Sequence, residues 1–184
     1  MKDKIYLVFG VLIILAIAVY FFMQQQSVVP EEVSHASSFE ECVQEGNPVM
    51  ESYPRQCNTK DGKNFVEYIG NGLEKRDLIR LESPQPNQTI ESPLTITGEA
   101  RGYWFFEASF PIVLTNWDGL IIAEGFATAQ DEWMTEEFVP FEATLTFVVD
   151  PDVYSKKGTL ILQKDNPSGL SENDDALEIP VTFK

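Results

Sequence analysis

Residues 98–112 read Gly-Glu-Ala-Arg-Gly-Tyr-Trp-Phe-Phe-Glu-Ala-Ser-Phe-Pro-Ile, and this stretch decides the fold. It places five aromatic residues within eight positions, with the single charge of Glu107 among them. Such a stretch is costly to leave in water, so we expect a hydrophobic core to form around it. The even-numbered positions from 104 to 114 are all apolar, whereas the odd-numbered ones include Glu107 and Ser109. A period of two predicts a strand with one buried face.

This alternation assigns the side chains to two faces. The core face, together with two aromatic residues from later in the chain, is expected to hold Trp104, Phe106, Phe110, Trp133 and Phe141. The opposite face would hold Tyr103, Phe105 and Glu107, which are our first candidates for ligand binding. Asn166 and Ser168, in the turn Asn166-Pro167-Ser168-Gly169, are second candidates, although such side chains often bond only their own backbone.

Other short alternating segments lie on both sides of this stretch. We expect strands to begin near residues 79, 94, 104, 120, 139, 160 and 177, with turn signals between them and no helix. Pro111 requires a sheet edge or a bulge, because it has no N–H to donate. Seven short alternating strands are typical of an immunoglobulin-like antiparallel sandwich, which makes the fold all-β over residues 77–184.

The N-terminal region predicts a membrane anchor. Residues 5–23 are uncharged and mostly apolar, and a helix of this length spans roughly 28 Å, close to the hydrocarbon thickness of a bilayer. A cleaved signal peptide is the alternative, but the apolar run exceeds the usual length and no small-residue cleavage site follows it. Lys2 and Lys4 favour a cytoplasmic N-terminus and an extracytoplasmic remainder.

A polar tether, residues 24–38, would join the anchor to a small segment over residues 39–69. This segment holds both cysteines, Cys42 and Cys57, which in an exported chain most simply form one disulfide. Residues 70–76 are interpreted as a hinge to the main domain.

Charge and residue types limit the possible functions. The net charge is −16, which argues against nucleic acid as a partner and against docking on anionic lipid. The only histidine, His35, lies in the tether, so a Ser-His-Asp site is not expected. We therefore expect no enzyme activity, no cofactor and no metal site.

Three alternatives remain open. Glu107 among aromatic residues could serve a glycosidase that uses two carboxylates. The acidic loops at 150–152 and 172–175 offer oxygen ligands for calcium, although without the spacing of an EF-hand. A module that binds peptidoglycan or surface polysaccharide would need at least one exposed tryptophan among Trp104, Trp117 and Trp133.

Four blocks of this sequence resemble the family called Gmad2, the immunoglobulin-like domain linked to bacterial spore germination. The blocks are Ser83-Pro84 through Ser92-Pro93-Leu94-x-Ile96-x-Gly98-x-Ala100, then Trp104-Phe105-Phe106-Glu107-Ala108, then Trp133-Met134-Thr135 with Phe138-Val139-Pro140-Phe141, and Lys164-Asp165-Asn166-Pro167-Ser168-Gly169. The resemblance covers about residues 77–184 and implies a bacterial, extracytoplasmic domain without established enzymatic activity. We therefore expect a non-catalytic binding or scaffolding protein of the cell envelope, with an envelope protein or a polysaccharide as its partner.

Overall fold

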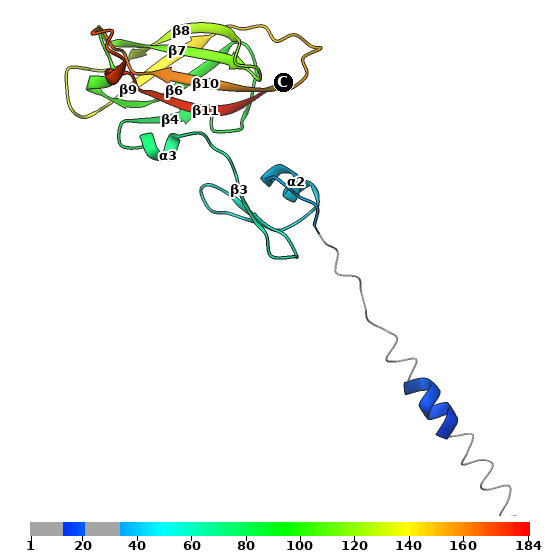
Figure 1. Ribbon diagram of the computed structural model, residues 1–184. Helices are drawn as coiled ribbons and strands as arrows, with labels where there is room; N and C mark the ends of the chain where they lie inside the picture. The colour runs from blue at the N-terminus through cyan, green and yellow to red at the C-terminus, as the bar shows by residue number, and fades with distance from the viewer. Residues whose placement is uncertain (1–12, 21–33) are drawn as a thin grey trace, which may run out of the picture. The chain divides into compact units, whose positions relative to one another are not determined.

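The computed structural model describes residues 13–20 and 34–184, and it divides the chain after Val66 into two compact units (Figure 1). Residues 13–20 are helical and exposed. The rest of the expected anchor, and residues 24–33 of the expected tether, lie outside the described residues. Within the described ranges, none of the helices has both the length and the apolar character needed to cross a bilayer.

The first unit consists of one short helix and one small sheet. Its elements are α2 (Phe39–Gln44), β1 (Val49–Met50), β2 (Gln56–Asn58) and β3 (Asn64–Val66), with the strands in the order β1-β2-β3. The predicted disulfide is confirmed: Cys42 on α2 and Cys57 on β2 are bonded, and both are fully buried. With Ala36 and Phe39 they form the buried core of this unit.

Sequence reasoning missed helix α2, although its start carries a recognisable signal. The Ser38 side chain accepts a hydrogen bond from the Glu41 backbone N–H at 3.1 Å, as an N-cap residue does. The sequence Ser38-Phe39-Glu40-Glu41 has the spacing of a capping box. The first helical turn also carries two acidic side chains, which favour the positive end of the helix dipole.

Three carboxyl groups of the first unit have lowered pKa values: those of Glu41, Glu45 and Asp61. Hydrogen bonds from Ser37 are the main cause of the lowered pKa of Glu41. The Ser34 hydroxyl donates to Glu45 at 2.6 Å, and this hydrogen bond is the main cause of the lowered pKa of Glu45. The Thr59 hydroxyl likewise lowers the pKa of Asp61, and Lys63, 3.2 Å from that carboxylate, lowers it further. The ionised forms of these groups therefore favour the folded unit.

The second unit is built on one mostly antiparallel sheet of eight strands. Its elements are α3 (Gly72–Lys75), β4 (Ile79–Ser83), β5 (Thr89–Ile90), β6 (Leu94–Arg101), η1 (Gly102–Trp104), β7 (Ser109–Asn116), β8 (Ile121–Ala129), β9 (Phe138–Leu145), β10 (Lys157–Gln163), η2 (Ser171–Asn173) and β11 (Ala176–Phe183). The strand order is β4-β6-β9-β8-β7-β10-β11-β5, and only β5 and β11 pair in parallel. The all-β prediction therefore holds for this unit, with one short strand, β5, more than the seven expected.

The sheet encloses its core by curling rather than by forming two separate layers. Strands β8 and β9 connect its two halves through only two registered pairs, Thr128 with Glu142 and Ala129 with Phe141. Side chains from both halves meet in one buried cluster, which includes Ile96 and Phe141 from one half and Leu160 from the other. The pairing of β8 with β9 closes the gap that separates the sheets of a two-layer sandwich.

In residues 98–112 the predicted alternation of buried and exposed side chains is correct only in part. Trp104, Phe110 and Phe141 are buried as expected, and Trp133 packs partly buried against the same core. Phe106, however, is 43% exposed, whereas Phe105, assigned to the outer face, is buried at 4%.

The cause is a break in the strand before β7. Residues 102–104 form the 3-10 helix η1, and Glu107 and Ala108 have positive φ angles of 50° and 62° in the turn that follows. Alternation applies only to extended backbone, so the parity of Trp104 does not continue to Phe106. It begins again at Ser109, where β7 starts.

Pro111 lies in a strand with two neighbours rather than in an edge strand. β7 pairs with β8 and with β10, but the registered pairs with β10 end at Ile112. Pro111 is paired across to Phe126 of β8 alone. Its missing N–H therefore falls where the second neighbour has ended, which satisfies the same physical requirement as an edge.

The expected hinge at residues 70–76 is instead held against β11. The Asn71 side chain donates to the Ala176 carbonyl at 3.0 Å and accepts from the Glu178 N–H at 2.8 Å. Gly70 has a φ of 75°, and a Cβ there would lie 1.9 Å from the Glu178 carbonyl oxygen. Only glycine permits this approach, so residues 70–71 act as a short continuation of the sheet.

Candidate functional site

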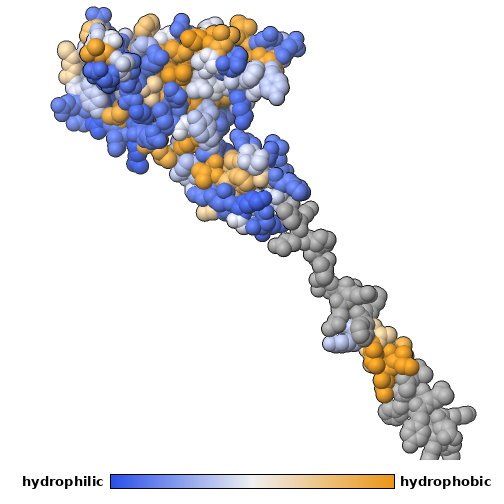
Figure 2. All heavy atoms as spheres, viewed as in Figure 1, coloured by the Kyte–Doolittle hydropathy of each residue, from blue (hydrophilic) through white to orange (hydrophobic). Residues whose placement is uncertain are grey.

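The outer surface of strands β8, β7, β10 and β11 carries a group of apolar side chains among polar ones. The inward positions of these strands are buried in the core, and the alternate, outward positions include Pro111, Val113, Ile121, Phe126, Ile161 and Pro180, interspersed with threonine and glutamate residues. We call this set the apolar strip. Figure 2 shows hydrophobic side chains gathered over the region in which Figure 1 places β7, β8 and β10.

Exposure within the apolar strip is highest on β8. Phe126 is 64% exposed and Ile121 is 51% exposed, whereas Val113 on the neighbouring strand is only 8% exposed. Val113 does not belong to the main core cluster, so its neighbours on the outer surface cover it. An exposed apolar patch rimmed by polar residues marks an interaction site on many soluble domains.

Two carboxylates flank the centre of the apolar strip. The register places four residues in one row across the strands: Glu124, Val113, Ile161 and Glu178. We call this set the acid-flanked row. Both carboxylates are exposed, and neither forms an ion pair within the part of the chain that the structure describes. Among the outward positions of these four strands, all of which are described, the one basic residue is Lys157, at the start of β10.

A pair of exposed aromatic rings lies at one end of the same sheet. Trp117, in the turn between β7 and β8, is 45% exposed, and Tyr154, in the loop before β10, is 89% exposed. Their ring centroids are 5.2 Å apart, and the ring planes are inclined by 51°. Leu120 in the same turn is 65% exposed.

The residues predicted to bind a ligand do not form one surface. Tyr103 is 50% exposed and Glu107 is exposed in the turn before β7, but Phe105 between them is in the core. The backbone N–H of Asp165 donates to the Trp104 carbonyl at 3.0 Å, which brings the loop of Asn166 alongside η1.

Asn166 and Ser168 use their polar groups to hold their own loop. Asn166 donates to the Leu170 carbonyl at 2.8 Å and to the Asp174 carboxylate at 2.7 Å. Its side-chain oxygen accepts from the hydroxyl of Ser168, and that hydroxyl oxygen accepts from Asn173 at 3.0 Å. These bonds describe a structural turn, and a role in binding stays a prediction for both residues.

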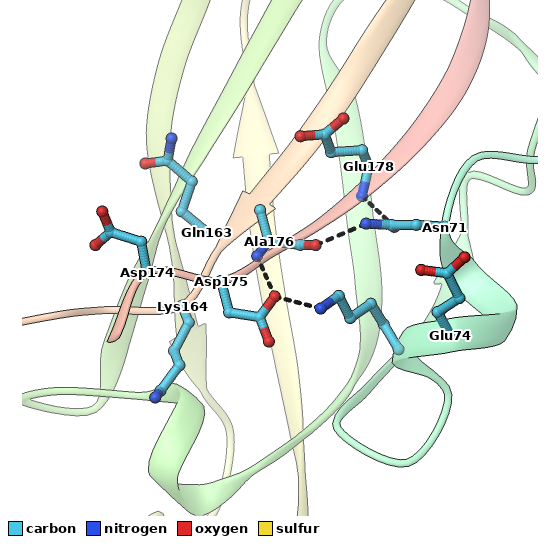
Figure 3. Close-up of a pocket in the computed structure, with 9 residues that line it drawn as sticks. Asn71, Glu74, Gln163, Lys164, Asp174, Asp175, Ala176 and Glu178 are labelled. Atoms are coloured by element: carbon cyan, nitrogen blue, oxygen red, sulfur yellow. Dashed lines mark hydrogen bonds and ion pairs between the residues drawn. The ribbon is translucent and has the colours of Figure 1, made fainter. Parts of the chain in front are cut away.

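An open pocket of about 540 Å³ lies between the α3 region and the start of β11 (Figure 3). Its lining is polar and includes Glu74, Lys75, Lys164 and Asp175. Lys75 pairs with Asp175 at 2.5 Å, and Asp175 also accepts from the backbone of Ala176 at 2.9 Å. These contacts, drawn in Figure 3, neutralise the most enclosed charges of the pocket, so its chemistry is that of a structural ion pair.

The calcium alternative depends on a cluster of oxygen-bearing side chains. Within residues 13–20 and 34–184, no group of three or more His, Cys, Asp or Glu side chains is placed to hold a metal ion. His35 is exposed, and its backbone N–H donates to Glu45 at 3.1 Å.

Sequence reasoning missed the apolar strip, although one signal could have indicated it. Residues 110–114, Phe-Pro-Ile-Val-Leu, are all apolar, so one of the two faces of β7 had to carry apolar groups away from the core. The alternation of apolar positions describes only the core-facing side chains of β7 and therefore does not predict apolar residues on its outer face.

An eight-stranded, curled β-domain, in a chain that also contains a small disulfide-bonded unit, is typical of an extracytoplasmic protein. A family model that matches the sequence identifies the family to which this domain belongs. The chain belongs to the Gmad2 family, the immunoglobulin-like domain of bacterial spore germination, over residues 78–171. No curated protein and no solved structure matches the chain. The family match ends before β11, which completes the sheet at Ala176–Phe183.

Proposed function

We propose that this chain is a non-catalytic binding or scaffolding protein of the bacterial cell envelope. In this proposal residues 5–23 hold it in the cytoplasmic membrane with its N-terminus in the cytoplasm, and both folded units lie outside. The apolar strip carries the proposal, because it exposes Phe126 and Ile121 on β8 beside half-buried apolar side chains of the neighbouring strands, and an apolar patch of this kind marks an interaction site on many soluble domains. The Cys42–Cys57 disulfide supports an oxidising, extracytoplasmic compartment.

Site-specific photo-cross-linking in the bacterium tests this function. A photoreactive residue replaces Phe126 in the full-length chain, and the same residue replaces Met134, which is 75% exposed outside the apolar strip, in a matched control. We expect position 126, and not position 134, to yield a covalent adduct with an envelope protein. Identical adducts at both positions, or none at position 126, would refute the proposal.

A second candidate function is the binding of envelope glycan, and the pair of Trp117 and Tyr154 favours it. Exposed aromatic faces stack on the apolar faces of sugar rings, and Trp117 meets the requirement for an exposed tryptophan. Co-sedimentation of the full chain with insoluble peptidoglycan tests this candidate. Trp117→Ala should abolish sedimentation and Met134→Ala should preserve it. Equal sedimentation of the two variants would exclude this site.

A further inference from the structure

The acid-flanked row has a geometry that restricts its partner, and this argument rests on the proposed binding function. Glu124 and Glu178 are separated by three strand-to-strand steps, which is about 14 Å at the usual spacing of about 4.8 Å. Between them lie Val113, which its neighbours cover, and Ile161, which is half-buried. The row therefore presents two exposed acids along one line across the sheet, with Ile161 as the apolar side chain accessible between them.

An extended peptide segment matches these distances. Extended backbone rises about 3.4 Å per residue, so side chains at positions i and i+4 are about 14 Å apart and point to the same side. The side chain at i+2 lies midway between them, over the junction of β7 and β10. Basic residues at i and i+4 would then meet Glu124 and Glu178, and an apolar residue at i+2 would meet Ile161.

The other possible occupants fit less well. A second copy of this chain would bring together two molecules that each carry a net charge of −16, and like charges across an interface oppose association. An anionic membrane surface is repelled for the same reason. A partner with basic residues beside an apolar one gains from both the charge and the apolar surface of the row.

We infer that the acid-flanked row binds an extended, basic segment of an envelope protein with the pattern basic-x-apolar-x-basic, laid across strands β8, β7, β10 and β11. Phe126 and Ile121 border the row on β8 and would pack against the flanks of the bound segment. The two carboxylates set the spacing of the basic residues, and Ile161 provides the apolar contact between them.

Two synthetic peptides of identical composition provide the test. The matched peptide is Gly-Arg-Thr-Leu-Thr-Arg-Gly, and the shifted peptide is Gly-Arg-Thr-Leu-Arg-Thr-Gly, in which the second arginine faces the opposite side of an extended chain. Each carries a fluorophore, and its anisotropy is measured against the full-length chain in nanodiscs of zwitterionic lipid at low salt. We expect the matched peptide to bind at least about fivefold more tightly, because only it can reach both carboxylates.

Variants separate a specific row from general attraction to an acidic protein. Glu124→Gln with Glu178→Gln should weaken the matched peptide about fivefold or more. Glu132→Gln with Glu172→Gln removes the same charge from exposed positions outside the row, and it should leave affinity nearly unchanged. Equal binding of the two peptides, or equal weakening by the two double variants, would overturn the inference.

The outcome is distinguishable from failure of the proposed function. If neither peptide binds while position 126 still cross-links to an envelope protein, the inferred pattern is wrong and the binding function stands. If position 126 also yields no adduct, both fail.

Discussion

Loss of the Cys42–Cys57 disulfide should unfold the first unit and leave the second intact. The bond closes a loop across a sequence separation of 15, which is worth about 3 kcal/mol in the chain-entropy model. Among the described residues of the unit, the buried core consists of Ala36, Phe39 and the two cysteines themselves, with only Val49 and Phe65 packed partly buried against it. Full burial of a phenylalanine contributes about 1.5–3 kcal/mol, so removing the bond costs as much as the largest core side chain supplies. A segment this small does not bury enough surface to compensate.

Amide hydrogen exchange on the full-length chain, with and without reductant, measures the effect. The backbone N–H of Cys42 donates to the Ser38 carbonyl at 3.0 Å, and its protection should fall to that of an unfolded chain after reduction. Tryptophan fluorescence serves as the internal control, because Trp104, Trp117 and Trp133 all belong to the second unit. A Cys42→Ala/Cys57→Ala variant should behave like the reduced protein. Protection of the Cys42 N–H that persists after reduction would refute this account. A change in tryptophan fluorescence on reduction would refute it as well, because the second unit would then also be affected.

Three further predictions follow from local geometry. Gly70→Ala should lower the thermal midpoint of the second unit measured by tryptophan fluorescence, because its Cβ would collide with a carbonyl oxygen at a positive φ; an unchanged midpoint would contradict the fit against β11. Phe105→Ala should cost about 3–5 kcal/mol in denaturant unfolding and Phe106→Ala less than about 1 kcal/mol, and the reverse order would restore the simple alternation. The pKa values of Glu45 and Asp61 are lower in the folded unit than in the unfolded chain, where they are about 4.3 and 3.9. Both carboxylates therefore stabilise the first unit at pH values above the unfolded pKa values, and this stabilisation is lost as the pH falls through the lower folded pKa values. NMR of the first unit should therefore show acid destabilisation below about pH 4, and stability that is constant from pH 5 to pH 2 would disprove the role of these carboxylates.

The acid sensitivity and the disulfide concern the same small unit, whereas the proposed partner site belongs to the other one. Reduction of the chain therefore offers a separation of their roles. Peptide binding to the acid-flanked row should survive reduction, because strands β7, β8, β10 and β11 all lie in the second unit.

The sequence by itself determined the β-rich class, the pairing of the only two cysteines and the burial of Trp104, Phe110 and Phe141. Alternating apolar positions and turn residues are local signals, and they survive wherever the backbone is extended. The same logic failed at Phe105 and Phe106, because a turn with two positive φ angles resets the phase of the alternation. Positive φ angles are usually adopted by glycine, and neither Glu107 nor Ala108 is a glycine. The residue types therefore gave no signal that predicts this turn.

Only the tertiary structure decided where a partner could bind. The acid-flanked row is assembled from residues 113, 124, 161 and 178, and the hairpin of β7 and β8 meets β10 and β11, which come later in the chain, only in the folded sheet. Turn geometry and the hydrophobic pattern set the register within each hairpin, but no local signal shows that β10 pairs with β7. For that reason the sequence could indicate that a core exists, and the folded sheet alone could show which apolar residues are left outside it.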